Sequence, residues 1–134
     1  MKPRLLFVDD DPKLLRGIQR ALSFKRDEWE MLFANGGLEA LALMEQITVD
    51  VVISDLRMPG MNGLEFLNRV KLQCPQITRL VLSGEMDESL SAASLGVAQQ
   101  YLFKPCGPDL LISTLDAILQ KRLLAQGVLE MIAG

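Results

Sequence analysis

The side chains best suited to chemistry are carboxylates placed directly after two apolar segments. A run of three aspartates, Asp9 to Asp11, follows the first apolar segment of the chain, and Asp55 follows the third. If these two segments end side by side, Asp9, Asp10 and Asp55 converge, and each pair of carboxylates about 5 Å apart repels by roughly 3 kcal/mol at an effective dielectric of about 20. A divalent cation relieves that repulsion. A few hard oxygen ligands, with room left for water and a phosphate oxygen, suit Mg²⁺ (or Mn²⁺) better than a fully caged Ca²⁺.

The acidic run also has a purely structural interpretation. Carboxylates just before Pro12 are favourable near the positive end of a helix dipole and can cap its first N–H groups. We expect Asp11 to do only that. The second acid, Asp55, at the end of another segment favours the metal interpretation for Asp9 and Asp10.

Two further apolar segments end in polar side chains of other kinds. One ends in Ser83, followed by Gly84, which allows the backbone to approach a ligand closely. The other ends in Lys104, followed by Pro105, which stops a strand. Each signal is weak alone, because a terminal serine is usually a turn former and Lys-Pro is usually a solvated loop. Together the four segments present acid, acid, hydroxyl and amine, a set that would surround one phosphoryl group.

The elements that must position these groups alternate between strand and helix. Apolar runs bounded by turn signals predict strands at 4–8, 30–34, 50–54, 78–82 and 99–103. Stretches of helical period predict helices from Pro12, after Asn35-Gly36-Gly37, at 64–73, at 87–95, and from Gly107 to about Gly127. Five such units predict an α/β, doubly wound parallel sheet, since each crossover is right-handed. Ligands bind such sheets beyond the carboxyl ends of the strands, where the winding reverses.

Two of the helices have an expected apolar face. In the first, the residues that share the face are Leu14, Leu15, Ile18 and Leu22. In the second, the residues that recur at intervals of three and four positions are Leu38, Leu41, Ala42 and Glu45.

Composition narrows the class of protein. The 134 residues are enough for one domain, and they carry 14 Lys and Arg against 17 Asp and Glu with no concentrated basic segment, which argues against direct nucleic-acid binding. No apolar run is long enough for a membrane span and the N-terminus lacks an apolar signal core, so a cytoplasmic protein is expected. The chain has no histidine, which excludes Ser-His and Cys-His catalysis and histidine metal ligands.

Four motifs together resemble the receiver domain of two-component response regulators. They are Phe7-Val8-Asp9-Asp10-Asp11-Pro12, Ser54-Asp55-Leu56-Arg57-Met58-Pro59-Gly60-Met61-Asn62-Gly63, Leu82-Ser83-Gly84 and Tyr101-Leu102-Phe103-Lys104-Pro105. The resemblance covers roughly residues 3–125 and implies a flavodoxin-like (βα)5 fold with strand order 2-1-3-4-5 and helices on both faces, an order that the chemotaxis receiver also has. It places a receiver domain at 1–126 and the end of a helix or a truncated linker at 127–134.

Position by position, the resemblance implies roles for the residues of the site. Asp55 matches the phosphoacceptor, and Asp9 and Asp10 match the acidic pair that holds the metal, with Asp55 and the backbone carbonyl of Arg57 as the remaining protein ligands. Lys104 matches the lysine of the family.

A second group of matching positions implies a switch. Ser83 stands where the family has Thr or Ser, and Tyr101 stands where it has an aromatic switch residue. The alternative for Tyr101 is a partly buried aromatic at a strand edge without a switching role. The resemblance also implies a cis peptide bond between Lys104 and Pro105.

The charges two residues beyond the acceptor and the hydroxyl suggest control of hydrolysis. Arg57 follows Asp55 by two positions and Glu85 follows Ser83 by two. A salt bridge between them would gate water access, and the alternative is two unconnected solvated side chains.

The chemistry requires a donor, because a chain without histidine receives the phosphoryl group from another molecule. The resemblance names the donor class as a sensor histidine kinase or a histidine phosphotransfer protein. It places the contact with an output domain or downstream protein on the helix at 87–95, the strand at 99–103 and the last helix, and a homodimer is a further expectation. Such a domain catalyses its own aspartyl phosphorylation and dephosphorylation without being a conventional turnover enzyme.

Two alternatives stay open at this point. A haloacid-dehalogenase-like phosphohydrolase also has Asp-x-Asp after its first strand, as Asp9 and Asp11 are here, but it requires Thr or Val where this chain has Lys13. A pseudo-receiver would keep the fold and signal by protein contact without phosphorylation.

Overall fold

Five parallel strands form a single sheet in the order β2-β1-β3-β4-β5. The computed structural model describes residues 2–84, 92–93 and 96–133. The strands are β1 (Arg4–Val8), β2 (Glu30–Ala34), β3 (Val51–Ser54), β4 (Thr78–Ser83) and β5 (Gln100–Phe103). The fold class and strand order expected from the sequence are confirmed, and each strand boundary falls within one residue of its prediction.

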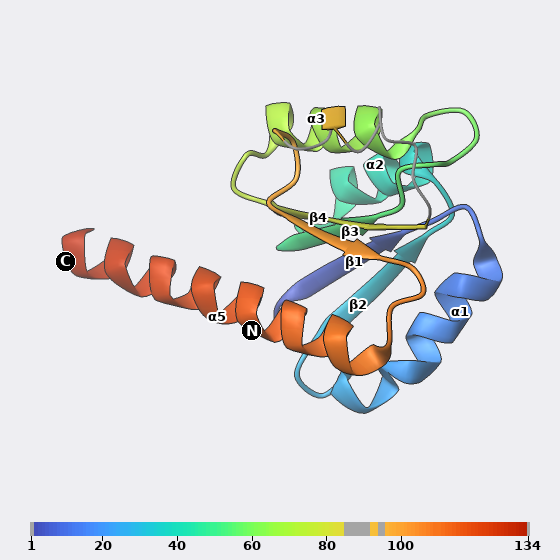
Figure 1. The fold of residues 1–134 in the computed structure, drawn as a ribbon. Helices are drawn as coiled ribbons and strands as arrows, with labels where there is room; N and C mark the ends of the chain where they lie inside the picture. Colours follow the sequence, from blue (N-terminus) through green and yellow to red (C-terminus); the bar gives the residue numbers. More distant parts are fainter. Residues whose placement is uncertain (1, 85–91, 94–95, 134) are drawn as a thin grey trace.

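Helices cover both faces of this sheet (Figure 1). They are α1 (Pro12–Ala21), α2 (Gly37–Gln46), α3 (Gly63–Gln73) and α5 (Pro108–Ala133), with a short 3-10 turn η1 (Ser23–Lys25) after α1. The helix predicted at 87–95 lies outside the described residues except for positions 92–93. No helix within the described ranges is both long and apolar enough to cross a membrane.

Alternation along the strands divides the core into two layers. Leu6, Val8 and Val52 point toward α2 and α3, where they pack with Phe66 and Leu67. The neighbouring strand positions point to the other face, where α1 and α5 bury the apolar side chains Leu5, Phe7, Ile53, Leu15 and Leu115. Burial on both faces explains why β3 is apolar at every position but its last.

The second helix presents a different face to the core from the one predicted. Leu38 is 68% exposed, and Ala42 and Glu45 are exposed as well, whereas Ala40 is fully buried. The cause is Gly37, whose missing side chain lets α2 approach the next layer: a Cβ at this position would lie 3.0 Å from the Met61 sulfur. The expected face is therefore wrong at Leu38, Ala42 and Glu45, whereas Leu41 is half-buried and packs against the core.

The last helix is longer than predicted. The predicted helix runs to about Gly127, with the end of a helix or a linker at 127–134, and in the structure α5 continues to Ala133. Gly127 lacks the left-handed conformation that ends helices, and one internal glycine costs only about 1 kcal/mol relative to alanine. The helix is thus continuous across the expected domain boundary at 126–127, and that boundary stays a prediction.

The loop between β3 and α3 is held against the end of β3 by a glycine. A Cβ added to Gly63 would lie 1.9 Å from the Asp55 carbonyl oxygen and 2.7 Å from the Leu56 Cα. The Gly63 backbone N–H donates to the Leu56 carbonyl at 2.8 Å. Only a residue without a side chain fits this approach.

We expect Gly63→Ala to lower the free energy of unfolding by about 2–4 kcal/mol, because the new methyl group meets backbone that cannot move independently of Asp55. The matched control is Gly17→Ala in α1, where nothing lies within 4 Å of the new Cβ. That change should stabilise the protein by about 0.5–1 kcal/mol. Urea unfolding of both variants measures the two effects, and equal stabilities would contradict the packing of this loop.

Candidate functional site

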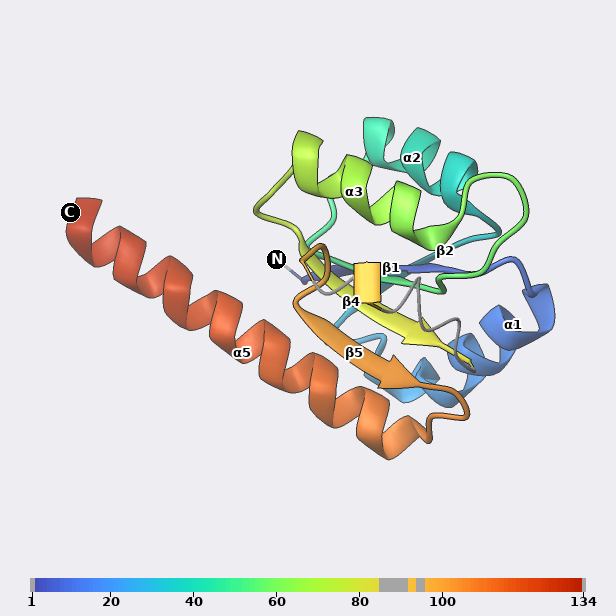
Figure 2. The same ribbon diagram turned by 45° about the horizontal axis from the view of Figure 1, so that its top comes forward.

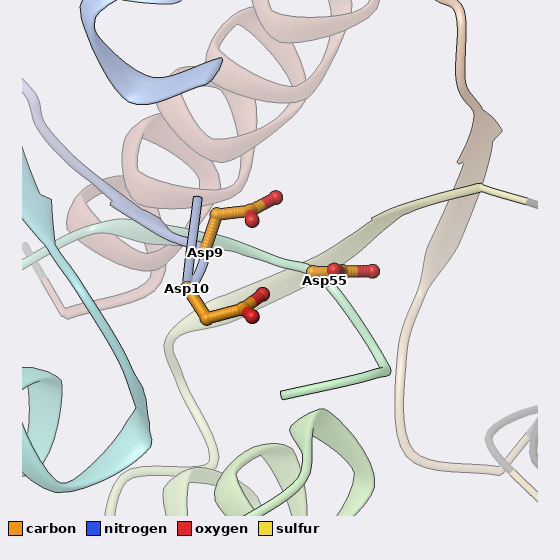
Figure 3. A group of neighbouring side chains, drawn as sticks. All are labelled: Asp9, Asp10 and Asp55. Atoms are coloured by element: carbon orange, nitrogen blue, oxygen red, sulfur yellow. The ribbon is translucent and has the colours of Figure 1, made fainter. Parts of the chain in front are cut away.

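Three carboxylates meet at the carboxyl ends of the two central strands. In the register of the sheet, Val8 of β1 lies opposite Ser54 of β3, so the residues that follow them leave the sheet side by side. One carboxylate oxygen from each of Asp9, Asp10 and Asp55 lies within 4.8 Å of the others. Figure 3 shows the three side chains at these strand ends. Asp9 and Asp55 are buried and Asp10 is exposed, so the group is open to solvent on one side.

A lysine amine from the edge of the sheet reaches the same point. Lys104 directly follows β5, and its backbone N–H extends the ladder by donating to the Ser83 carbonyl at 2.8 Å. Its Nζ lies 2.7 Å from Asp9 Oδ2 and 3.4 Å from Asp55 Oδ2. One ammonium group therefore bridges the acids of β1 and β3.

The hydroxyl of Ser83 completes the surroundings of Asp55. Ser83 is the last residue of β4, and its Oγ donates to Asp55 Oδ1 at 3.0 Å. Each oxygen of the Asp55 carboxylate thus has a different partner, Ser83 on one and Lys104 on the other. The side chains at the ends of β1, β3, β4 and β5 therefore lie close together, as the sequence predicts.

Burial and charge oppose each other within this group. Burial raises the pKa of the Asp9 carboxyl above its ordinary value, although the hydrogen bonds from Lys104 and from the Asp11 backbone counteract it. For Lys104, burial alone favours the neutral amine, but the hydrogen bond with Asp9 and the charges of Asp9 and Asp55 outweigh it and raise the pKa. The lysine stays charged, and one ammonium does not neutralise three carboxylates.

The donor set fits a hard divalent cation. Three carboxylate groups supply oxygen ligands close enough to share one ion, and the exposed position of Asp10 leaves room for water. An ion of charge +2 would neutralise the negative charge that Lys104 leaves uncompensated. The types of these three residues and the distances between their oxygens thus fit the expected Mg²⁺ site.

Two other residues singled out in the sequence, Asp11 and Arg57, lie beside the carboxylate group. Asp11 is the N-cap of α1 and accepts hydrogen bonds from the N–H groups of Lys13 and Leu14, as expected. Arg57 is exposed in the loop after Asp55 and lines an open pocket there with Met58, Pro59 and Asn62. Its role as a ligand through the backbone carbonyl stays a prediction.

Three further expectations concern Tyr101, the Lys104–Pro105 peptide bond and Glu85. Tyr101 of β5 is half-buried, with its ring centroid 5.8 Å from that of Phe103. The peptide bond between Lys104 and Pro105 is cis, as the resemblance implied. Glu85 lies outside the described residues.

Two residues that support the site, Ser54 and Gly63, were not predicted to have a role in it. Ser54 is fully buried, and its hydroxyl donates to the Asp55 carbonyl at 2.8 Å. Gly63 packs against that same carbonyl. A role for Ser54 could have been predicted, because it is the one polar residue in the otherwise apolar strand β3.

The sequence profile of the response regulator receiver domain matches residues 5–116. Among curated proteins, the hydrogenase transcriptional regulatory protein HoxA of Cupriavidus necator is 38% identical over 112 residues, covering 82% of this chain and 23% of HoxA. The nitrate/nitrite response regulator protein NarL of Escherichia coli is 32% identical over 113 residues, covering 83% of this chain and 52% of NarL. The chain therefore spans about half or less of these relatives.

Solved structures of similar domains share the fold. A CheY-like response regulator receiver domain protein from Methanospirillum hungatei JF-1 has a TM-score of 0.86 at 26% identity, covering 93% of this chain and 99% of that one. The signal receiver domain of an HD domain-containing protein from Pseudomonas fluorescens Pf-5 has a TM-score of 0.86 at 31% identity, covering 91% and 98%.

We expect Asp9→Asn to raise the melting temperature by a few degrees at neutral pH without metal, because the raised pKa means that ionising Asp9 destabilises the fold. The direction follows from the linkage of protonation and folding. The free energy lost by ionising Asp9 in the folded protein is absent below the ordinary carboxyl pKa and grows as the pH rises toward and through the pKa of the folded state. Mg²⁺ should then stabilise the parent chain and not the variant.

Asp27→Asn removes the same charge from an exposed position outside the site and serves as the control. Melting curves of the three proteins in EDTA, at neutral and at acid pH, make the comparison. An Asp9→Asn protein that melts no higher than its parent at neutral pH would show that the site is not electrostatically strained.

Proposed function

Since the chain belongs to the receiver domain family of two-component response regulators, we propose that Asp55 is its phosphoacceptor. The observation that carries this proposal is the placement of Asp55 between the Ser83 hydroxyl and the Lys104 ammonium, beside the acidic pair of β1.

The reaction is a displacement at phosphorus. An oxygen of the Asp55 carboxylate attacks in line, the new O–P bond forms, and the bond from phosphorus to the donor nitrogen breaks with its electron pair leaving on the donor, which takes up a proton. Negative charge spreads over the three equatorial oxygens of the phosphoryl group. Lys104, already directed at Asp55 Oδ2, is placed to stabilise that charge as it develops.

Asp9, Asp10, Asp55 and the backbone carbonyl of Arg57 are the residues that would hold Mg²⁺ or Mn²⁺. When bound, the ion reduces the repulsion between the carboxylate and the incoming phosphoryl group. Asp9 has a second task, because its 2.7 Å ion pair orients the Lys104 amine. The acidic pair thus serves both the metal and the lysine.

Phosphorylation would act on the fold through Ser83 and Tyr101. A phosphoryl group on Asp55 adds up to about two negative charges and new acceptor oxygens, which draw the Ser83 hydroxyl away from its present bond to the carboxylate. Tyr101, half-buried on the neighbouring strand, would turn inward into the space that opens. The added charge at Asp55 would thus shift the equilibrium between two conformations of one surface.

The partners follow from the same proposal. The donor is a phosphohistidine on a sensor kinase or a phosphotransfer protein in the cytoplasm. The switching surface comprises the helix predicted at 87–95, β5 and α5, and it would contact an output domain or a downstream protein. A homodimer belongs to the same proposal.

We expect Asp55→Asn to lower labelling by acetyl phosphate and Mg²⁺ at least about 100-fold, because the attacking oxygen is lost. Asp11→Asn is the matched control: asparagine caps a helix as well as aspartate does, so labelling should stay within about threefold of the parent. Intact-protein mass spectrometry before and after hydroxylamine treatment measures the acyl phosphate.

Two results would contradict this proposal. Equal labelling of the Asp55→Asn protein and its parent would place the phosphoryl group elsewhere. No labelling of the parent, together with amide NMR shifts that beryllofluoride and Mg²⁺ leave unchanged, would make the chain a pseudo-receiver.

We also propose that Arg57 and Glu85 together slow hydrolysis of the phosphoryl group. Alanine at either position should shorten the lifetime of the acyl phosphate by about 2–10-fold, because water reaches it more easily. Arg16→Ala and Glu45→Ala change exposed charges on other helices and should leave the lifetime unchanged. Loss of radiolabel over time gives the rates of the four variants and of the parent. A lifetime equal to that of the parent for both Arg57→Ala and Glu85→Ala would contradict the gate.

A further inference from the structure

The last position of β3 places a hydroxyl in an otherwise apolar layer. Ser54 is fully buried, and the register of the sheet sets it between Val8 of β1 and Val81 of β4, which are buried as well. Alternation along the strand puts its side chain on the same face as Val52, the face that α2 and α3 cover (Figure 2). An apolar side chain would suit this position, because burying a hydroxyl costs free energy unless the hydroxyl makes a hydrogen bond.

The hydrogen bond of this hydroxyl reaches the main chain of the next residue. Ser54 Oγ donates to the Asp55 carbonyl oxygen at 2.8 Å. On the other side of the Asp55 Cα, the Asp55 backbone N–H donates to the Val8 carbonyl at 3.0 Å. The two peptide groups that flank this Cα thus each make a hydrogen bond to a buried residue, and together they orient the bond from which the carboxylate leaves the chain.

Phosphorylation would exchange the partners of the Asp55 carboxylate but not those of its main chain. Ser83 and Lys104 contact the carboxylate oxygens, and both would turn to the oxygens of an incoming phosphoryl group. The bond from Ser54 is to a main-chain carbonyl, which takes no part in the displacement at phosphorus. This carbonyl also begins the segment that leads to Arg57, two residues further on, whose own carbonyl is the proposed ligand of the ion.

We propose that Ser54 is a positioning residue for phosphoryl transfer. Its hydroxyl orients the Asp55 main chain and, through it, both the attacking carboxylate and the ion ligands. The proposal rests on the role of Asp55 proposed above. Hydrogen bonds to the groups behind metal ligands affect metal affinity and activity, and small misplacements of reacting atoms slow a reaction strongly. A serine with a merely structural role would change the stability of the fold and leave ion affinity and reaction rate as they are.

Three substitutions separate the hydroxyl from the space that it fills. Ser54→Ala removes the hydroxyl, Ser54→Cys keeps a side chain of similar size with a weak donor, and Ser54→Thr keeps the hydroxyl in a residue type that strands favour. We expect the first two to slow labelling by acetyl phosphate and Mg²⁺ about 5–20-fold, and Ser54→Thr to stay within about threefold of the parent. The control is Thr114→Ala, which changes another buried polar residue, in α5, and should leave the rate within about twofold.

Two further readouts need no phosphoryl donor. Electron paramagnetic resonance of Mn²⁺ measures ion affinity, which Ser54→Ala and Ser54→Cys should each weaken about 3–10-fold and Ser54→Thr should preserve. In EDTA, the carbonyl ¹³C NMR signal of Asp55 should move in the same two variants, because the hydrogen bond to that carbonyl is lost or weakened. Urea unfolding measures the stability that each variant and the Thr114→Ala control lose, and shows that each is folded before it is assayed.

Labelling and Mn²⁺ affinity equal to those of the parent in Ser54→Ala would overturn the proposal, as would an equal loss of both in Thr114→Ala. If Ser54→Thr does not fold, Ser54→Cys decides, because a parental rate in that variant overturns the proposal as well. A parent chain that acetyl phosphate does not label contradicts the phosphoacceptor assignment instead. The Mn²⁺ affinities of the Ser54 variants then decide by themselves whether this serine positions the ion ligands, so the two failures are distinguishable.

Discussion

The ion pairs of Lys104 with Asp9 and Asp55 are the interactions on which the site depends. Two buried carboxylates from neighbouring strands repel each other, and the Nζ atom at 2.7 and 3.4 Å from them is the positive charge that the described part of the chain places between them. The same amine is placed to stabilise a phosphoryl group. One amine thus serves both the buried carboxylates and the chemistry, and the negative charge that Lys104 leaves uncompensated explains why a metal ion would be bound.

Parallel pairing is what makes this contact possible. All five strands have the same direction, so acids, hydroxyl and amine that lie up to 95 positions apart in the chain arrive at one edge of the sheet. The register is specific to a single residue, because a shift by one would turn Val8 and Ser54 to opposite faces and move the following aspartates. The Ser54 hydroxyl then donates to the Asp55 carbonyl, and Gly63 packs closely against it.

The sequence predicts those parts of the structure that local pattern and strand order determine. Apolar runs bounded by turn signals locate the strands. Because a parallel sheet brings the carboxyl ends of its strands together, Asp9, Asp10, Asp55, Ser83 and Lys104 can be assigned to one site from the sequence. The rotation of α2 could not be predicted, since it depends on the contact of Gly37 with Met61 across layers. The end of α5 could be predicted only approximately, because a glycine such as Gly127 is compatible both with a helix end and with a continuing helix. The roles of Arg57 and Tyr101 depend on states other than the one described.

The position of a bound ion tests the central claim most directly. Mn²⁺ added to isotope-labelled protein broadens amide NMR signals according to their distance from the ion. We expect selective broadening in four segments that only the folded sheet brings together: Asp9 to Asp11, Asp55 to Arg57, Ser83 and Lys104. Broadening centred instead on acids at the other end of the sheet, such as Glu28, Glu30 and Asp50, would contradict it.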